Sequence, residues 1–539
     1  MKNILLTILF LLTLIACSQQ EKADLLVINA NIYTVNDSFA KMEALAVKDG
    51  KIIAVGNTED IQQKYATLKT LDAKGKTILP GLIDAHCHFY GLGLAEQKVR
   101  LEGTKSYDEV LERLVAFQKE KNLPFITGRG WDQNDWEIKE FPTKEKLDAL
   151  FPDTPVAVSR IDGHALLVNQ AAIDLAEITI NTPFSGGDIL KKDGKLTGII
   201  IDGPMDLIFA KIPEPTLKEA TQALKNAESV CFNLGLTTVD DAGLDRKAIE
   251  LIDSLQQTGE LKMKVYAMVS TNKQNLDYYL EKGISKTDRL NVRSFKFYGD
   301  GALGSRGATM RKSYSDKPNH FGAMIFDTET IQNTAQRIAN SDFQMNTHAI
   351  GDSANHTILQ AYANVLKDKK DRRWRIEHAQ ILSPEDFEAF QQIIPSVQPT
   401  HATSDMYWAE DRVGAKRIKG GYAYKDLLKK YGKVALGTDF PVEKVNPMLT
   451  FYAAVARKDL NNFPEGGFQI ENALTREEAL KGMTIWAAYS NFEEHEKGSI
   501  EVSKFADFII LDQNIMEVEI SEVPKTKVLQ TFVNGEKVN

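Results

Sequence analysis

The chain has 539 residues, of which 43% are hydrophobic and 26% are charged, and its formal net charge at pH 7 is −9. This composition is typical of a soluble globular protein, and the acidic balance without a basic stripe argues against a nucleic-acid-binding surface. Beyond the N-terminus only Cys87 and Cys231 remain, too few for a disulfide scaffold, so we expect two buried small side chains and leave their pairing open.

The N-terminus has the pattern of a lipoprotein leader. Lys2 precedes a short apolar run from Ile4 to Ile15, which is too short to span a bilayer comfortably and is typical of a signal-peptide core. Cys17 follows in the segment LIAC, which resembles a bacterial lipobox. The resemblance implies cleavage before Cys17 and lipidation of its thiol. A buried N-terminal helix with a chance cysteine is the alternative.

The leader pattern also sets an expected location. We expect a signal peptide at 1–16 and a polar tether at 17–23. The lipid would anchor the protein to a membrane of the cell envelope. Ser18 favours the outer membrane of a Gram-negative cell, with the protein on its periplasmic or surface face.

The two ends of the mature chain share one style of sequence. From Asp24 onward short strand-like runs alternate with Gly and Asn, and the C-terminus returns to this style in ADFIILDQN and VLQTFVNGEKV. We therefore expect residues 24–78 and 495–539 to form one small composite β-sandwich domain.

Between the two ends runs an alternation of strands and helices. Eight strand segments, mostly apolar throughout, follow one another, and helical patterns such as DTETIQNTAQRIANS and PEDFEAFQQI separate the later ones. This order predicts an α/β fold of the (β/α)8, TIM-like barrel type over residues 79–494. The segments are ILPGLIDAHCH, LTTVDDAG, KVYAMV, SFKFYGDG, QMNTHAIGD, RIEHAQ, PSVQPTHA and KVALGTDFPV.

The first connection is far too long for one helix. About residues 91–217 lie between the first and second strands and carry strand-like pieces of their own. An inserted subdomain is therefore expected, because long structureless loops are uncommon in compact domains. An insertion at the carboxyl end of the strands would cover the barrel mouth.

Residues that can bind metal gather at the predicted carboxyl ends of the strands. His86 and His88 are two apart, so on a strand they share a face. His348, His378 and Asp439 end the fifth, sixth and eighth strands. Barrel enzymes place their active sites at this end, and converging imidazoles with a carboxylate are typical ligands of a divalent cation. The joint placement predicts a metal site.

Lys296 stands in the fourth strand on the face opposite Phe295 and Phe297, and therefore points into the barrel. A protonated lysine would repel a metal, but burial lowers the pKa of a lysine and leaves a nucleophilic amine. Reaction with CO2 would give a carbamate whose two oxygens could each hold one metal. An ordinary lysine on an exposed sheet face is the alternative.

Seven segments together resemble the amidohydrolase superfamily, and within it the amidohydrolase-3, YtcJ-like group that includes N-substituted formamide deformylase-like hydrolases. The resemblance covers nearly all of the mature chain. Its segments are LPGLIDAHCHF, GRGWDQNDW, SRIDGHALLVN, FKFYGDGALGSRGA, NTHAIGD, RIEHAQ and LGTDFPV.

The resemblance implies one or two divalent cations per chain, most simply Zn2+, at six positions of this sequence. His86, His88 and Asp439 would bind the first cation, His348 and His378 the second, and N6-carboxylated Lys296 would bridge them. Asp439 would also take a proton from the metal-activated water and pass it to the leaving nitrogen.

Substrate contacts are expected from the insertion and from the loops. Three of the expected contacts have a structural alternative. It is core packing for Trp131, a structural hydrogen bond for His164 and a surface salt bridge for Arg306. Asp300 belongs to the loop after Lys296, and His401 is expected either behind the metal ligands or on the substrate carbonyl. The expected substrate-binding residues are Trp131, His164, Asp300, Arg306 and His401.

These patterns predict a lipid-anchored, metal-dependent hydrolase of an amide, formamide or N-acyl bond other than a peptide bond. The expected partners are a small-molecule amide substrate, the membrane and a second copy in a homodimer, and no nucleic acid. A cyclic amide or amino-acid-derived amide hydrolase, a phosphotriesterase-like hydrolase and a non-catalytic solute-binding lipoprotein are the alternatives.

Overall fold

The computed structural model describes residues 20–161, 163, 165–183 and 187–539. The expected signal peptide and Cys17 lie outside these residues. The chain divides into two compact units, one made of the residues up to 91 together with 227–539 and the other of residues 92–226. No helix in the described ranges combines the length and the apolar character that crossing a bilayer requires.

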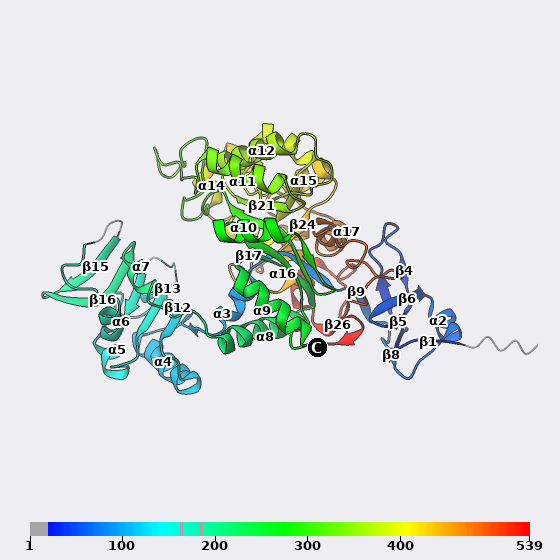
Figure 1. Cartoon of the computed structure of the whole chain (residues 1–539), viewed down its shortest axis with the longest axis horizontal. Helices are drawn as coiled ribbons and strands as arrows, with labels where there is room; N and C mark the ends of the chain where they lie inside the picture. Colours follow the sequence, from blue (N-terminus) through cyan, green and yellow to red (C-terminus); the bar gives the residue numbers. More distant parts are fainter. Residues whose placement is uncertain (1–19, 162, 164, 184–186) are drawn as a thin grey trace, which may run out of the picture. The chain divides into compact units, whose positions relative to one another are not determined.

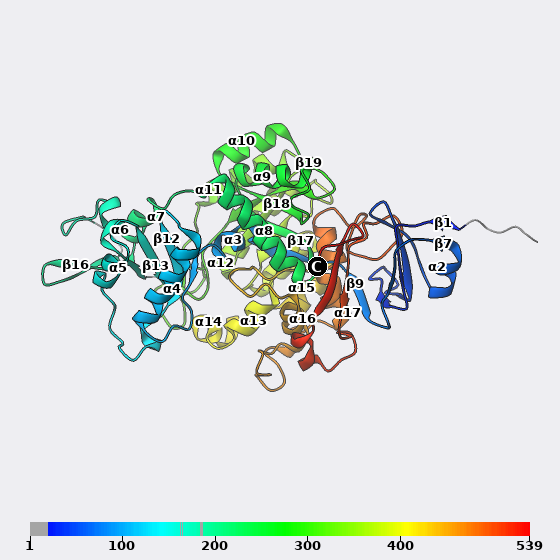
Figure 2. The same ribbon diagram turned by 90° about the horizontal axis from the view of Figure 1, so that it is seen from below.

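The larger unit contains a nearly closed barrel of eight parallel strands, which Figure 1 and Figure 2 show from two directions. Each strand pairs with the next along the chain, and β19 (Ser285–Lys286) pairs antiparallel with β20. The strands coincide with the eight segments expected from the sequence, so the (β/α)8 prediction is confirmed. They are β10 (Leu82–Cys87), β17 (Leu236–Leu244), β18 (Lys264–Ser270), β20 (Leu290–Tyr298), β21 (Gln344–Ala349), β22 (Arg375–His378), β23 (Ile394–Val397) and β24 (Ala435–Leu436).

Helices connect the strands, and α11 (Thr328–Ala339) shows why they form. Its apolar residues recur at helical spacing and are buried, and Asp327 caps the first turn by accepting a hydrogen bond from the Thr330 N–H. The segment PEDFEAFQQI forms only a 3-10 helix, η2 (Pro384–Gln391), which lacks a side-chain cap. The other helices are α8 (Leu217–Asn233), α9 (Arg246–Gln257), α10 (Lys273–Lys282), α12 (Asp352–Leu366), α13 (Pro399–Asp405), α14 (Ala409–Arg417), α15 (Tyr424–Tyr431), α16 (Pro447–Ala456), α17 (Arg476–Gly482) and α18 (Ile485–Ser490).

The barrel closes between its last strand and its first. β24 is only two residues long, so side chains and the following turn complete the seam. Asp84 accepts hydrogen bonds from the Thr438 N–H (3.0 Å) and the Thr438 hydroxyl (2.6 Å). The Asp439 N–H donates to the His86 carbonyl and the His88 N–H donates to the Phe440 carbonyl, both at 2.8 Å.

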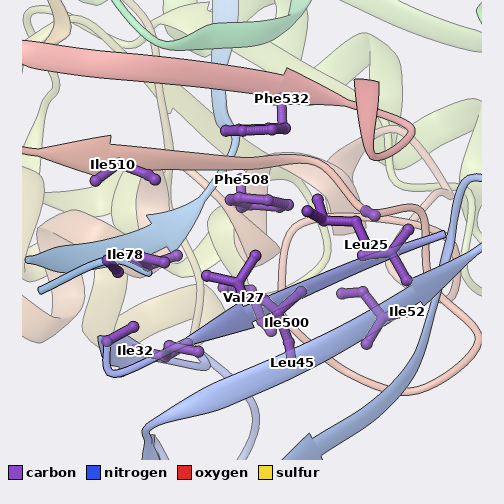
Figure 3. Packing of buried hydrophobic residues seen from close by; sticks show 14 residues of the cluster. Leu25, Val27, Ile32, Leu45, Ile52, Ile78, Ile500, Phe508, Ile510 and Phe532 are labelled. Atoms are coloured by element: carbon purple, nitrogen blue, oxygen red, sulfur yellow. The ribbon is translucent and has the colours of Figure 1, made fainter. Parts of the chain in front are cut away.

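Two further sheets lie in the larger unit. The sheet of order β6-β5-β2-β8 comes from the N-terminal end alone, and the sheet of order β27-β26-β25-β9-β3-β4 combines strands from both ends of the chain. Figure 3 shows the apolar core that they share, where the rings of Phe508 and Phe532 stack with centroids 4.4 Å apart. We expected the barrel to begin at 79, whereas β9 continues to Pro80 and the barrel begins at Leu82. The strands are β2 (Leu25–Ile28), β3 (Asn31–Tyr33), β4 (Lys41–Met42), β5 (Ala44–Lys48), β6 (Lys51–Gly56), β8 (Thr70–Asp72), β9 (Thr77–Pro80), β25 (Phe508–Leu511), β26 (Val528–Val533) and β27 (Glu536–Lys537).

Residues 92–226 form the second unit, where the sequence suggested an insertion at about 91–217. Its sheet has the order β11-β12-β13-β14-β16-β15, and its apolar core includes Trp131 and Trp136. The elements are β11 (Val99–Arg100), α4 (Tyr107–Lys121), β12 (Ile126–Trp131), α5 (Glu145–Leu150), β13 (Val156–Arg160), β14 (Ala165–Val168), α6 (Gln170–Leu175), β15 (Gly187–Lys192), β16 (Lys195–Asp202) and α7 (Met205–Phe209).

A buried ion pair joins the amino end of a barrel strand to the composite sheets. Lys264, the first residue of β18, places its Nζ 2.5 Å from Oδ2 of Asp507, which directly precedes β25. Both side chains are almost fully buried, and the ammonium also lies 3.8 Å from the centroid of the Phe505 ring. Burial lowers the pKa of Lys264 to about 8, so its charge depends on the neighbouring carboxylate.

Replacing Asp507 by Ala would leave the Lys264 ammonium buried without its partner. We expect Asp507→Ala to lower the free energy of unfolding by about 3–5 kcal/mol, measured by urea denaturation. Lys264→Met combined with Asp507→Leu should recover most of this loss, whereas Lys41→Ala, in an exposed pair with Glu517, should cost less than about 1 kcal/mol. An unchanged urea midpoint for Asp507→Ala would contradict a stabilising role of the buried pair.

Candidate metal centre

Two groups of side chains at the carboxyl end of the barrel could each hold a metal ion, and they share Asp439. His86, His88 and Asp439 form one group, and His378, His401 and Asp439 form the other, with the candidate ligand atoms of each group within 4.8 Å of one another. Oδ1 of Asp439 lies 3.2 Å from Nε2 of His88 and 3.6 Å from Nε2 of His86. Its Oδ2 lies 3.6 Å from Nε2 of His401. One carboxylate therefore faces both groups.

Strand alternation explains only part of this convergence. His86 and His88 share a face by their spacing, whereas His378 follows Glu377 directly and alternation would turn it away from the barrel. His378 adopts a left-handed backbone, with φ of 75°, and its ring centroid lies 4.8 Å from that of His86. Asp439 is also left-handed, with φ of 63°. Backbone strain of this kind concentrates at functional sites, and here it redirects two candidate ligands.

Lys296 lies beside these groups. Its Nζ is 3.0 Å from Nε2 of His86, and the residue is 1% exposed. Burial lowers the pKa of Lys296 to about 8, although the carboxylates of Glu377, Asp439 and Asp241 favour the charged form. Burial therefore makes the neutral amine more accessible than for an exposed lysine, and this amine faces the candidate ligands.

Glu377 is a component of the site that the sequence did not reveal. Its Oε2 lies 2.6 Å from Nδ1 of His86, and both side chains are fully buried. The carboxylate accepts the proton of Nδ1, so the lone pair of Nε2 points towards Asp439 and Lys296. The segment RIEHAQ contains Glu377 directly before the candidate ligand His378. Strand alternation puts the two side chains on opposite faces, so the sequence suggests no role for Glu377 in the site.

The buried histidines are suited to bind a cation. Burial, together with neighbouring positive groups, holds the pKa values of His86 and His378 well below the usual range, and burial lowers the pKa of His348 to about 3. Their rings are therefore neutral and carry free lone pairs. Burial alone would raise the pKa of Asp439, but the His88 ring, 3.2 Å from its Oδ1, and the surrounding imidazoles hold it well below its usual range.

Unpartnered polar atoms support the same interpretation. Nε2 of His348, Nε2 of His401 and Oδ1 of Asp439 are buried and have no hydrogen-bond partner among the described residues. Buried polar atoms are normally satisfied, so several unpartnered atoms at one place are typical of a site that binds a ligand. Nitrogen and carboxylate donors in this number fit a divalent cation such as Zn2+.

The sequence placed His348 with His378 at the second cation, and His401 behind the metal ligands or on the substrate carbonyl. The His348 ring lies 4.5 Å from that of His378, but the group with His378 and Asp439 contains His401 and not His348. Nε2 of His348 is 3.6 Å from Oδ1 of Asp300. His401 is reached from the first turn of α13, one turn after β23, which is why strand spacing did not identify it as a ligand.

Asp300 has a structural task instead of a substrate contact. It is 1% exposed, and its carboxylate accepts backbone N–H groups from Thr309 (2.8 Å), Ile350 (3.0 Å) and Gly351 (2.9 Å). These bonds occupy both oxygens and tie the loop after β20 to the loop after β21. A substrate would have to displace backbone partners to reach Asp300, so its expected role is corrected.

Arg306 forms the salt bridge that was its alternative. Its Nε and Nη2 bind the two oxygens of Asp316 at 3.1 and 2.7 Å, and Arg412 joins the same carboxylate. The fork of Arg306 is therefore already filled by a carboxylate of the protein. Substrate binding by Arg306 would require Asp316 to be displaced.

Trp131 is a core residue of the 92–226 unit, which corrects the expected substrate contact. Its side chain is fully buried, its indole N–H donates to the Val158 carbonyl at 2.8 Å, and its ring packs near Trp136 and Phe141. A bulge at Gly130, whose φ is 112°, interrupts the alternation of β12 and turns Trp131 into this core, whereas regular alternation would leave it on the face of the exposed Arg129. His164, the other candidate from the insertion, lies outside the described residues.

Comparison with known proteins gives consistent matches over most of the chain. A family profile described as "Amidohydrolase family" matches residues 69–539. Protein LONG AFTER FAR-RED 3 of Arabidopsis thaliana is 32% identical over 96% of this chain and 91% of its own length. Putative amidohydrolase YtcJ of Bacillus subtilis is 31% identical over 94% and 98%, respectively. N-substituted formamide deformylase of Arthrobacter pascens is 25% identical over 95% and 97%.

Solved structures match the fold along nearly the whole chain. An uncharacterized metal-dependent hydrolase from Pyrococcus horikoshii OT3 superposes with a TM-score of 0.79 at 29% identity, covering 92% of this chain and 99% of its own. A second uncharacterized metal-dependent hydrolase, from Pyrococcus furiosus, gives the same TM-score of 0.79 at 27% identity, with 92% and 100% covered.

Glu377 should set the metal affinity through His86. We expect Glu377→Ala to weaken Zn2+ binding by about 10- to 100-fold, because the imidazole loses the acceptor that fixes its tautomer and orientation. Equilibrium dialysis with elemental analysis would measure this, and thermal unfolding would show that the fold is kept.

Glu443→Gln is the matched control. Glu443 follows Asp439 by four residues, but its carboxylate accepts a hydrogen bond from the Ser404 hydroxyl at 2.6 Å and belongs to neither group of candidate ligands. Its Zn2+ affinity should equal that of the wild type. Equal affinities of Glu377→Ala and Glu443→Gln would remove Glu377 from the metal centre.

Proposed function

Because this chain belongs to the amidohydrolase family, we propose that it is a metal-dependent hydrolase of a carbon–nitrogen bond other than a peptide bond. A formamide or another N-acyl compound is the proposed substrate class. The convergence of His86, His88, His378 and His401 on the single carboxylate of Asp439 carries this proposal. The relative from Arthrobacter pascens, whose name specifies an N-substituted formamide, supports the choice of bond.

We propose that His86, His88 and Asp439 hold one divalent cation and that His378 belongs to a second position. His401 and His348 flank that position from α13 and β21, and both present an unpartnered Nε2. A bound cation would lower the pKa of a water molecule and polarise the substrate carbonyl. The chain must then orient the carbonyl and move protons.

Asp439 is the proposed proton carrier. Its pKa is held low, so the carboxylate is ionised and can accept a proton from water. It can then deliver this proton to the leaving nitrogen. Oδ1 and Oδ2 face different histidines, so one oxygen can remain a ligand while the other carries the proton.

Tyr298 is a candidate for binding the substrate. It follows Lys296 by two residues, so both side chains lie on the inner face of β20, and its side chain is 37% exposed. Its ring centroid lies 5.8 Å from that of His348. A phenol at this place could donate a hydrogen bond to a carbonyl oxygen beside the metal ligands.

We further propose that Lys296 is carboxylated. The neutral amine attacks CO2, a nitrogen–carbon bond forms, and one proton is released, which leaves a carbamate anion in place of the ammonium. The buried position beside Nε2 of His86 and the lowered pKa support this step. The carbamate would supply the bridging oxygens that the histidines cannot.

The position in the cell envelope remains a proposal based on the leader. Lipidation at Cys17 would attach the hydrolase to the outer membrane through the tether at 17–23. We also propose that the protein forms a homodimer. The chemistry proposed for the barrel depends on neither the membrane anchor nor the homodimer.

A substrate panel on protein lacking the leader would test the activity. We expect release of amine from N-formyl and other N-acyl amines, about two transition metals per chain, and no turnover of phosphate triesters. Asp439→Asn should retain most of the metal and lose about 10²- to 10⁴-fold in turnover, which is typical of a lost general base. Turnover of phosphate triesters alone would favour a phosphotriesterase-like hydrolase, and binding of amides without turnover would favour the solute-binding alternative.

Lys296→Ala should lower the metal content, because it removes the proposed bridging anion. Added short carboxylates such as acetate or propionate should partly restore activity by occupying the vacated space. The wild-type protein should not respond to the same carboxylates. Normal metal content in Lys296→Ala, by elemental analysis, would exclude the bridging role.

A further inference from the structure

A cavity on the barrel unit shares no residue with the candidate metal centre. It is an open cavity of about 710 Å³ lined by the segment that follows β22, the first turn of α12, the end of α14 and the helix α15. Figure 1 labels the three helices. This volume lies in the range of small-molecule sites in proteins. All of its lining residues belong to the larger unit.

The cavity is positively charged in a chain whose net charge is −9. Seven basic and four acidic side chains line it, a surplus of three positive charges. Three of the basic side chains already have acidic partners: Arg311 pairs with Glu385, Lys429 with Asp426, and Lys430 with Glu388. The surplus therefore comes from the other four, which are Lys312, Lys416, Arg417 and Lys419.

These four cations have no carboxylate partner among the described residues. Lys312, Lys416 and Lys419 are exposed and enter no ion pair there. Arg417 is half-buried and held rigidly by backbone carbonyls: it donates to Val413 (2.6 Å), Lys312 (2.8 Å) and Ser313 (2.9 Å). Carbonyl oxygens fix the position of the guanidinium but carry no full negative charge. An anion bound nearby would lower the free energy of keeping this charge half-buried.

One acidic side chain remains in the cavity, and it does not neutralise the four cations. Asp352 is buried at the start of α12, where it accepts the backbone N–H of Arg311 at 2.8 Å. Burial raises the pKa of Asp352, although Arg311 and Arg417 favour its ionised form. The electrostatic character of the cavity is therefore set by the lysines and Arg417.

Part of the cavity lining is apolar. Leu382, Pro384 and Phe387 come from the segment after β22 and line the same cavity. A ligand that fits both surfaces combines an anionic group with an apolar body. Lysine ammonium groups around one arginine are typical of phosphate recognition.

We propose that this cavity binds a phosphate-bearing small molecule with an apolar substituent. The site is separate from the metal centre and is independent of the hydrolysis proposed above. The phosphate would be held by Lys312, Lys416, Lys419 and the edge of Arg417, and the substituent would contact Phe387. Anionic lipid headgroups share the phosphate chemistry, but a volume of about 710 Å³ with apolar residues in its lining favours a soluble ligand.

Phenyl phosphate is a suitable probe, and binding would be measured by calorimetry on the full metal-loaded protein. We expect the triple variant Lys312→Met, Lys416→Met, Lys419→Met to weaken binding by at least about tenfold, because it removes three charge-assisted contacts. The triple variant Lys48→Met, Lys69→Met, Lys74→Met removes three exposed lysines of the composite sheets, and its affinity should be unchanged. Binding should weaken as ionic strength rises.

A second measurement tests the apolar wall. Phe387→Ala should abolish the preference of the protein for phenyl phosphate over methyl phosphate while leaving methyl phosphate binding unchanged. Unaltered phenyl phosphate binding in the first triple variant would assign the ligand to the metal centre, which that variant preserves, and would overturn the proposal. Binding to vesicles of phosphatidylglycerol without binding to phenyl phosphate would overturn it in favour of a lipid surface.

Discussion

The seam between β24 and β10 is the constraint on which the rest of the site depends. Asp84 holds Thr438 through two hydrogen bonds, and the Asp439 N–H binds the His86 carbonyl. A side chain at Gly437 could not be accommodated, since a Cβ there would lie 2.5 Å from the backbone nitrogen of His86. The close approach that closes the barrel therefore also brings the first two histidines to the shared carboxylate.

The interior of the barrel is held by charges rather than by apolar side chains alone. Arg375 donates to Asp240 at 3.0 Å, and its guanidinium lies 3.9 Å from Glu377, which in turn binds His86. All of these side chains are fully buried, so Arg375, Asp240 and Glu377 depend on one another to remain ionised, whereas the His86 ring is neutral. This network explains how a buried carboxylate can orient a metal-binding histidine, and why Lys296 shares the same enclosed space.

Function is concentrated where the backbone departs from regular geometry. His378 and Asp439 are left-handed at the ends of their strands, and α13 begins immediately after β23 and carries His401. Regular strands would supply at most every second residue to the barrel mouth. The strained ends add further ligands at the same level, and the surrounding packing supports the cost of that strain.

The sequence by itself determined the eight barrel strands and the similar strand-like runs at the two ends of the chain. It also determined the candidate ligands His86, His88, His378 and Asp439. Periodicity and strand-end position are local properties, so both can be recognised in the sequence. It did not identify Glu377, whose role depends on a strained φ at its neighbour His378. It named His401, but not as a metal ligand, because that position depends on the direction of a helix. The substrate contacts expected of Trp131 and Asp300 were not found for the same reason, because the partners of both side chains come from other segments. Trp131 donates to the Val158 carbonyl. Asp300 accepts the backbone N–H groups of Thr309, Ile350 and Gly351. Only the tertiary structure decides which polar groups a side chain meets, because those contacts join residues that are distant along the chain.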